Sequence, residues 1–184
     1  MRVIAGSARS IPLVTPEGGE ITRPTQDRIK ETLFNIIQLE VPGAVFLDLC
    51  SGSGGIGIEA ISRGARHCYF VENHKEAAGC IQANLHKTRF EDRATVLKQD
   101  VLHAIANIHE KAVDVVYLDP PYASPLLEQA LLRLSRAPYV TPDTLIIAET
   151  TLNEDLSFLE GTGLSVTREK KYKTNQHVFI RKQV

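Results

Sequence analysis

Residues 44–57 read AVFLDLCSGSGGIG and hold the strongest structural signal in this 184-residue chain. The first half, residues 44–49, is a short apolar run of the kind that forms a buried strand. The second half is rich in glycine, which lets the backbone turn tightly and approach a ligand where a Cβ atom would collide. A helix is expected over residues 55–62, and the free N–H groups of its first turn would face the same loop. Strand, glycine turn and helix together predict a ligand site in an α/β fold.

The same alternation of strand and helix continues along the chain. Further strands are predicted at residues 68–71, 94–97, 113–118 and 145–148, and further helices at residues 75–87 and 126–134. The strands are apolar on both faces. Strict alternation of such strands with helices predicts a parallel sheet that is covered by helices on each side.

The two ends of the chain depart from this rhythm. Two short β-like runs, at residues 3–4 and 12–14, suggest a small hairpin before a turn at Gly18-Gly19. An amphipathic helix is expected over residues 26–40, beginning after Thr25. At the other end, residues 164–167 and 178–180 predict an antiparallel hairpin with its turn around Asn175. A parallel sheet completed by an antiparallel pair is the plan of class I, Rossmann-like methyltransferases, although other doubly wound folds also fit.

Length and composition predict one domain over residues 1–184, with an N-terminal extension at 1–40 and a catalytic core at 41–184. Apolar residues make up 43% of the chain, and no apolar run approaches the ~20 residues that cross a bilayer. The first residues lack the apolar core of a secretory signal. The 3 cysteines have no metal-ligand spacing. We therefore expect a cytoplasmic protein with reduced thiols, no membrane contact and no metal.

The charge is unevenly distributed, although the net charge is only −1. Residues 1–30 hold 5 Lys/Arg against 3 Asp/Glu, and residues 161–184 hold 6 against 1. The totals of 21 and 22 leave 10 against 18 for residues 31–160. If the two basic ends meet in space, they form a positive face suited to phosphates. The alternative is that residues 168–173 are a solvated strand or turn.

The glycine loop allows two cofactor classes. Gly52, Gly54 and Gly57 match the dinucleotide-binding spacing, so a nicotinamide or flavin cofactor must be weighed. Asp48, at the end of the preceding strand, instead puts a carboxylate where a pyrophosphate would approach, which suits the ammonium group of a methionine moiety. Glu72 could accept ribose hydroxyls in either class. Each of these two acids, and also Asp100 farther along the chain, could alternatively be a helix N-cap or a solvated strand end.

We therefore expect S-adenosyl-L-methionine as cofactor, with Asp100 receiving the adenine amino group. The expected cofactor-binding residues are Asp48, Ser51, Gly52, Ser53, Gly54, Glu72, Asn73, Asp100 and Val101.

The strand at residues 113–118 delivers Asp-Pro-Pro-Tyr, residues 119–122, at the edge where open α/β sheets bind ligands. An exocyclic base amine is a poor nucleophile because its lone pair is delocalised, so it must be held and polarised. Proline has no N–H, so this turn offers rigid carbonyl acceptors without competing donors. Asp119 and the Pro120 carbonyl could accept both amine N–H bonds, and Tyr122 could stack on the base. The expected catalytic residues are Asp119, Pro120, Pro121 and Tyr122, although Asp-Pro-Pro also forms plain rigid loops.

Several motifs together resemble the bacterial small-subunit (16S) ribosomal RNA guanine-N2 methyltransferases, the RsmD family, over nearly the whole chain. They are RVIAG at 2–6, TRPT at 22–25, DR at 27–28, LFN at 33–35, DLCSGSG at 48–54, EA at 59–60, SRGA at 62–65, VE at 71–72 and DPPY at 119–122. The resemblance implies a class I fold, S-adenosylmethionine as methyl donor and methylation of a guanine N2. Three positions depart from the family: Cys50-Ser51 replaces a bulky residue and Ala, and Lys173 replaces Gly.

The chain offers no room for the separate target-recognition domain of DNA amino-methyltransferases, so recognition is expected from its basic ends. The expected substrate-binding residues are Arg23, Thr25, Arg28, Lys170, Lys171, Tyr172 and Lys173. The expected partner is ribosomal RNA or a small-subunit particle, bound by a monomer. An adenine-N6 methyltransferase acting on DNA or RNA remains open, since Asp-Pro-Pro-Tyr cannot separate the two amines. A nicotinamide-dependent oxidoreductase or an inactive nucleotide-binding module is a remote alternative.

Overall fold

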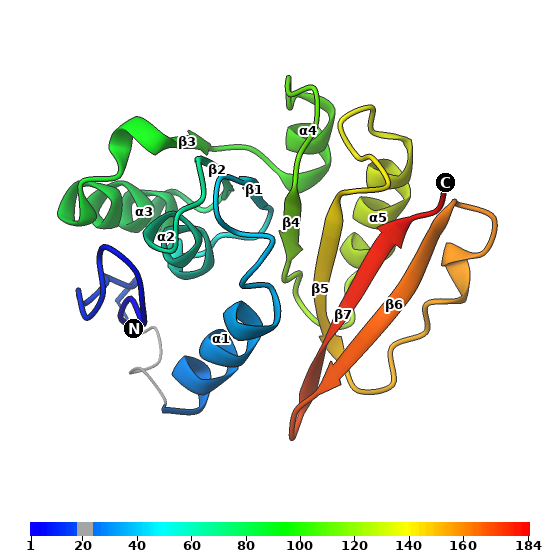
Figure 1. The fold of residues 1–184 in the computed structure, drawn as a ribbon, viewed down its shortest axis with the longest axis horizontal. Coiled ribbons are helices and arrows are strands. Elements are labelled where there is room, and N and C mark those ends of the chain that lie inside the picture. Colours follow the sequence, from blue (N-terminus) through cyan, green and yellow to red (C-terminus); the bar gives the residue numbers. More distant parts are fainter. Residues whose placement is uncertain (18–23) are drawn as a thin grey trace.

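A computed structural model describes residues 1–17 and 24–184 (Figure 1). The predicted turn at Gly18-Gly19 therefore lies outside the described residues. The described strands form one seven-stranded sheet in the order β3-β2-β1-β4-β5-β7-β6. The strands are β1 (Val45–Asp48), β2 (His67–Val71), β3 (Ala94–Leu97), β4 (Val115–Leu118), β5 (Leu145–Thr151), β6 (Leu164–Lys171) and β7 (Asn175–Lys182).

The first five strands pair in parallel, β7 runs antiparallel to β5, and β6 runs antiparallel to β7. The predicted fold class is thereby confirmed. The helices are α1 (Pro24–Ile36), α2 (Gly55–Ser62), α3 (Lys75–Thr88), α4 (Val101–Ala106) and α5 (Leu126–Arg136), with short 3-10 helices η1 (Glu91–Arg93) and η2 (Ser157–Leu159).

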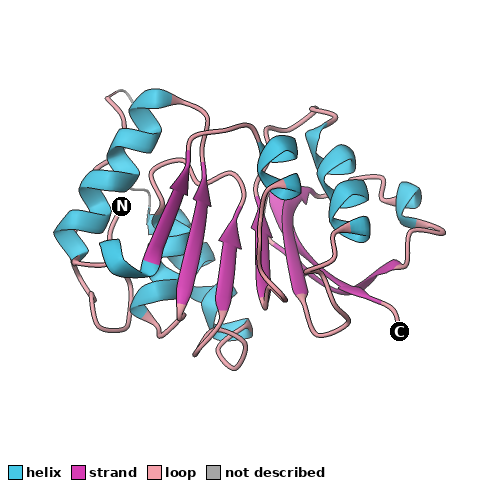
Figure 2. Cartoon of the chain, turned by 90° about the horizontal axis from the view of Figure 1, so that it is seen from above, coloured by secondary structure: helices cyan, strands magenta, loops and turns pink. Residues whose placement is uncertain are grey.

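Helices cover both faces of the parallel strands (Figure 2). In β1, alternate side chains enter two different cores because successive Cβ atoms point to opposite faces. Phe46 packs with apolar residues of α1, α2 and α3, whereas Val45 and Leu47 pack with those of α4 and α5. The central strands β1 and β4 are therefore buried on both sides, which explains why their sequences are apolar without alternation.

Several boundaries differ from the sequence-based expectation. Helix α1 begins at Pro24 and ends at Ile36, four residues before the expected end, and Glu40 N–H closes a turn on the Ile37 carbonyl instead. The strands of the C-terminal hairpin are longer than expected, and Asn175 begins β7 rather than forming the turn. The N-terminal hairpin is reduced to one isolated bridge between Arg2 and Pro12. The short helix α4 was not predicted.

A buried carboxylate attaches the N-terminal segment to the core. Glu59 on α2 accepts hydrogen bonds from the N–H groups of Ile4 at 2.8 Å and Ala5 at 3.0 Å. Its side chain also forms ion pairs with Arg63 at 2.8 Å and with Lys30 of α1 at 3.6 Å. Because Glu59 is fully buried, these four groups compensate its charge, and the same contacts fix the position of α1 against α2.

Candidate active site

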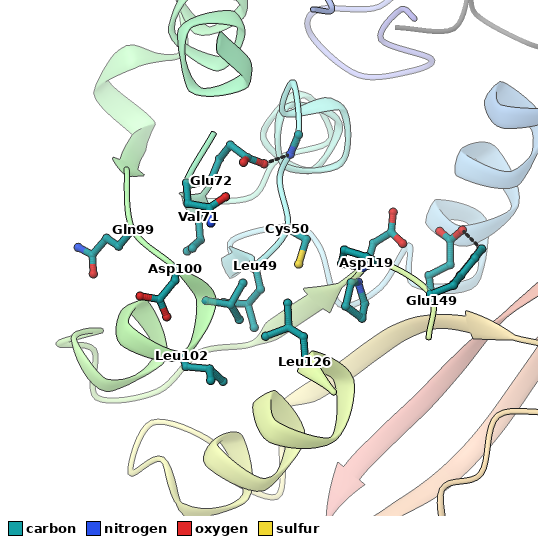
Figure 3. Close-up of a pocket in the computed structure, with 16 residues that line it drawn as sticks. Leu49, Cys50, Val71, Glu72, Gln99, Asp100, Leu102, Asp119, Leu126 and Glu149 are labelled. Atoms are coloured by element: carbon teal, nitrogen blue, oxygen red, sulfur yellow. Dashed lines mark hydrogen bonds between the residues drawn. The ribbon is translucent and has the colours of Figure 1, made fainter. Parts of the chain in front are cut away.

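The order of the sheet reverses between β1 and β4, which are neighbours although three α-helices, one 3-10 helix and two strands separate them in sequence. At such a switch point the loops that follow the two strands leave in opposite directions and open a crevice at the carboxyl edge. The glycine loop follows β1 and the Asp-Pro-Pro-Tyr loop follows β4. A cavity of about 730 Å³ lies at this point and is lined by residues of both loops (Figure 3).

This cavity, called the large cavity below, brings together nine of the residues expected at the site. They are Gly52, Glu72, Asn73, Asp100, Val101, Asp119, Pro120, Pro121 and Tyr122. Figure 3 shows Glu72, Gln99 and Asp100 toward one end, Asp119 and Glu149 toward the other, and Cys50 between them. The two predicted loops therefore face the same space.

The glycine loop is held by a carboxylate from the neighbouring strand. Glu72 accepts a hydrogen bond from Gly52 N–H at 2.9 Å and another from His74 N–H at 2.8 Å. Gly54 is the N-cap of α2 with a φ of 87°, a left-handed conformation that favours glycine. A side chain at Gly57 would collide with the Phe70 ring beneath it. These constraints account for glycine at positions 54 and 57, independently of any ligand.

Asp48 lies beneath the glycine loop, with only 1% of its surface exposed. One carboxylate oxygen accepts a hydrogen bond from Gly57 N–H at 3.1 Å, and the other has no partner among the described residues. Burial, reinforced by the charge of Glu72, raises the pKa of Asp48 to about 7. This carboxylate therefore stabilises the start of α2 from behind the cavity wall, and its direct contact with a ligand stays a prediction.

Asp100 serves as the N-cap of α4, because its carboxylate accepts a hydrogen bond from His103 N–H at 2.9 Å. The N-cap alternative for this acid therefore applies, while the residue also lines the large cavity. Its neighbour Gln99, which the sequence reasoning did not select, lines the same wall. The Gln99 Oε1 atom is buried and has no partner among the described residues, so it is a spare acceptor at the cavity.

Asp119 stands at the end of β4 on the wall of the large cavity. Asp119 is exposed to the cavity, but protein groups crowd around its carboxylate. This desolvation, with the nearby charges of Glu149 and Asp48, raises the pKa of Asp119 to about 8. Pro120 is buried, whereas Tyr122 is 53% exposed and donates a long hydrogen bond of 3.4 Å to Glu149. An exposed aromatic ring beside the carboxylates is free to stack on a planar ligand.

A polar network beside Asp119 was missed by the sequence reasoning. Glu149, in the middle of β5, accepts hydrogen bonds from Tyr117 O–H at 2.9 Å and from Asn175 Nδ2 at 2.7 Å. His177 is the register partner of Glu149 across β5 and β7, and its Nε2 lies 3.5 Å from the Glu149 carboxylate. Tyr172, selected from the sequence, contacts the other ring nitrogen of His177 at 3.1 Å. The sequence signal that could have indicated this network is the presence of Glu149 and His177 inside otherwise apolar strands.

A second cavity, of about 360 Å³, opens between α1 and the carboxyl edge of the sheet and is called the helix cavity. Its lining includes Ile29 and Leu33 of α1, Tyr117, His177, and the predicted cofactor residues Ser51 and Ser53. Four residues line both cavities, namely Cys50, Gly52, Asp119 and Glu149. The two cavities therefore adjoin at the two carboxylates.

The expected substrate-binding residues fall into two groups. Arg23 and the side chain of Thr25 lie outside the described residues. Arg28 is exposed and lines a surface hollow with Arg2 and Arg9, and Asp27 lines both this hollow and the helix cavity. At the other end of the chain, Lys170, Lys171, Tyr172 and Lys173 lie at the end of β6 and in the turn before β7.

The basic ends of the chain approach the site from two sides. Figure 1 shows α1 and the β6–β7 turn on the side of the sheet to which β5 points. The helix cavity is lined by α1 and by His177 of β7, so both ends contribute to one cavity.

Over residues 1–17 and 24–184, no helix is long and apolar enough to cross a membrane. The same residues contain no group of His, Cys, Asp and Glu arranged to hold a metal ion.

Comparison with known proteins found one matching family model, described as conserved hypothetical protein 95, over residues 1–181. The ribosomal RNA small subunit methyltransferase D of Haemophilus influenzae is 36% identical over 160 residues, covering 85% of this chain and 81% of that protein. The Escherichia coli protein of the same name is 30% identical over 172 residues, covering 92% and 84%. The solved structure of yhhF from Escherichia coli, described as a candidate methyltransferase, superposes with a TM-score of 0.84 at 27% identity, covering 100% and 98%.

Proposed function

The chain belongs to the conserved hypothetical protein 95 family and is similar to the ribosomal RNA small subunit methyltransferases D, and we propose that it methylates ribosomal RNA of the small subunit. We propose further that the methyl donor is S-adenosylmethionine and that the acceptor is the exocyclic N2 amine of a guanine. One observation supports this proposal most strongly: Gly52 and Asp119, from the two predicted loops, line the same cavity.

The charge of the large cavity favours a cationic cofactor. Its described lining includes four carboxylates, of Glu72, Asp100, Asp119 and Glu149, and no Lys, Arg or His. Such a wall would repel the pyrophosphate of a dinucleotide and attract a sulfonium or ammonium group. When bound, S-adenosylmethionine supplies an electrophilic methyl group on a positively charged sulfur. This contrast argues against the nicotinamide and flavin alternatives that the glycine spacing left open.

The residues on the wall fit the parts of this cofactor. Glu72 retains lone pairs beyond those used by backbone N–H groups, so it can accept ribose hydroxyls. The spare acceptor of Gln99, next to Asp100, can receive the adenine amino group. Leu49, Val71, Leu102 and Leu126 supply the apolar surface that an adenine ring needs.

Asp119 and Pro120 would hold the base amine. An ionised Asp119 and the Pro120 carbonyl accept its two N–H bonds, so the nitrogen lone pair is left free toward the methyl group. In the free protein the raised pKa favours protonated Asp119, which carries a donor of its own and is a weaker acceptor than the carboxylate. A neighbouring sulfonium would favour the ionised form. Cofactor binding would thereby prepare the acceptor, and alignment alone can contribute about 7 kcal/mol or more to catalysis.

The helix cavity is our proposed location for the target base. It adjoins the large cavity at Asp119 and is walled by Ile29 and Leu33 of α1. The surface hollow that Arg28 lines adjoins the helix cavity at Asp27. On the opposite wall, Tyr172, which stands among the lysines before β7, contacts His177. The phosphates of a structured RNA would therefore meet cations on both sides of the helix cavity. In this proposal residues 1–184 act as one domain, and the extension at 1–40 forms one wall of the base site.

Labelled methyl transfer tests the proposal. The wild-type protein is incubated with labelled S-adenosylmethionine and, in parallel, with undermethylated small subunits, naked small-subunit RNA and duplex DNA, and the labelled nucleosides are identified. We expect N2-methylguanosine in one of the two RNA samples and no label in DNA. Labelled N6-methyladenine would overturn the choice of base. Absence of label from all three, together with calorimetric binding of NAD but not of S-adenosylhomocysteine, would overturn the reaction class.

A further inference from the structure

Glu149 is the one carboxylate besides Asp119 that lines both cavities among the described residues. Its side chain is 18% exposed, and Figure 3 shows it at the same end of the large cavity as Asp119. The proposed chemistry at Asp119 gives Glu149 no task. An acidic side chain in the middle of a largely buried strand is costly unless it is compensated, so its retention calls for a physical account.

The surrounding residues hold Glu149 as a fixed acceptor. Asn175 donates to Oε1 at 2.7 Å and Tyr117 donates to Oε2 at 2.9 Å. His177 lies 3.5 Å from Oε2, in a position to donate when Tyr172 donates to its other nitrogen. The fourth donor, Tyr122, is 3.4 Å from Oε1 and belongs to an exposed side chain, so a ligand can displace it. Oε1 therefore has room for one incoming donor.

The same contacts keep Glu149 charged. Burial by itself would raise the pKa of this carboxyl, but the contacts with His177, Tyr117 and Asn175 outweigh it, and the pKa is lowered. The pKa of Asp119 is shifted in the opposite direction. Of the two neighbouring carboxyls, Glu149 is thus the one that stays ionised in the free protein and acts only as an acceptor.

We propose that Glu149 selects guanine by accepting its N1–H bond while Asp119 and Pro120 hold the adjacent N2 amine. On guanine, the carbon that carries the exocyclic amine lies between two ring nitrogens, of which N1 is a donor and N3 is an acceptor. On adenine and cytosine, the ring nitrogen next to the exocyclic amine is an acceptor, which an ionised carboxylate repels. Two acceptors beside one another at the junction of the cavities therefore match the donor pair of guanine and oppose the edges of the other two bases. This inference rests on the proposed function and extends it to specificity.

The test uses a base that keeps the amine but lacks the N1–H bond. The wild-type experiment first identifies the modified position and the form of RNA that is accepted. That RNA is then prepared with guanosine or with 2-aminopurine riboside at this position, and kcat/KM for labelled methyl transfer is measured for the wild type and for Glu149→Gln. We expect the wild type to prefer guanosine by about 100-fold, because the 2-aminopurine nitrogen would face a carboxylate. The glutamine side chain can donate to that nitrogen, so the preference should fall at least about tenfold.

Two control variants separate specificity from general loosening of the site. Tyr117→Phe removes one donor to Glu149 but leaves the carboxylate, so it should slow transfer and retain the preference for guanosine. Glu154 follows β5, and its carboxylate accepts a hydrogen bond from Thr151. The Glu154→Gln variant should leave the rate of methyl transfer and the preference for guanosine unchanged. Thermal unfolding and S-adenosylhomocysteine affinity of each variant check that the fold and the cofactor site remain intact.

The outcomes distinguish this inference from the proposed function. If the wild type methylates adenine N6, the choice of base fails before any variant is made. If guanosine is the substrate but Glu149→Gln keeps the wild-type preference, or if Tyr117→Phe loses it to the same extent, the inference alone is overturned.

Discussion

Replacement of Glu59 by glutamine is expected to destabilise the fold and to weaken RNA binding more than cofactor binding. Glu59 is fully buried, and the Lys30 and Arg63 side chains that it pairs with are only 8% and 16% exposed. Glutamine would leave both cations without a counter-charge. The glutamine amide nitrogen is a donor, so it would face one of the N–H groups that now donate to the carboxylate. Removing one partner of a buried ion pair costs about 3–5 kcal/mol. We expect about 3 kcal/mol, because Arg63 can still reach water.

Thermal unfolding of wild type and Glu59→Gln measures this effect. For a chain of this length, about 3 kcal/mol corresponds to a decrease in Tm of roughly 6–12 °C. Hydrogen exchange should accelerate at the N–H groups of Ile4 and Ala5, which bond Glu59 directly. Glu91→Gln is the matched control, because Glu91 pairs with His86 on the surface and its loss should leave Tm unchanged. Equal Tm values for the two variants would refute the reasoning.

The functional consequence follows from the position of α1. Glu59 fixes α1 through Lys30, and α1 forms one wall of the helix cavity. At a temperature where the variant is still folded, KM for RNA should therefore rise several-fold. The affinity for S-adenosylhomocysteine, whose proposed site is the large cavity, should change little. An equal loss of both would mean that α1 does not wall the base site.

Three further outcomes are expected. Asp119→Ala should reduce methyl transfer by roughly 100–1,000-fold with unchanged Tm, as loss of a positioning acceptor does in comparable sites; near-normal turnover would remove Asp119 from the chemistry. Burial raises the pKa of Asp48 in the folded protein to about 7 from 3.8, so ionisation of this carboxyl opposes folding. The free energy of unfolding of the wild type should therefore fall relative to that of Asp48→Asn as pH rises toward 7, and the difference should stay constant above pH 7. Urea unfolding at several pH values measures this difference, and a difference that does not depend on pH would contradict the reasoning. Charge reversal of Lys170, Lys171 and Lys173 together should weaken RNA binding and reduce its salt dependence while S-adenosylhomocysteine affinity stays the same, and loss of both affinities would refute that surface as an RNA contact.

The strands and their order of appearance were predictable because apolar runs and glycine turns are local signals. Helix α4 escaped prediction because its six residues, Val101–Ala106, are too few to display a helical period. Its N-cap, Asp100, was weighed both as a cofactor ligand and as a helix N-cap, but no helix was predicted after it. The end of α1 was placed too late because Ile37 continues the apolar period, although the chain already turns toward β1 there. Local pattern thus gives the elements more reliably than their ends.

The residues of the site were predictable where they belong to one short loop motif. They were less predictable where they come together only through the pairing of two strands. Gly52 and Asp119 could be selected from motifs, and their meeting in one cavity follows from the adjacency of β1 and β4. Glu149 and His177 come together through the antiparallel register of β5 and β7, which no short motif encodes. Asp48 was expected at the ligand, but burial beneath the loop depends on how α2 packs. Strand pairing and helix packing therefore determine the parts of the site that short sequence motifs do not encode.

A structure of the complex with S-adenosylhomocysteine tests the central claim most directly, since it locates the sulfur atom relative to Asp119. The account predicts the ribose at Glu72 and the sulfur at the junction of the two cavities, facing the Asp119 carboxylate and the Pro120 carbonyl across a gap that a methyl group and a base amine can fill. A sulfur atom held at the far end of the large cavity, beside Gln99 and Asp100, would contradict it.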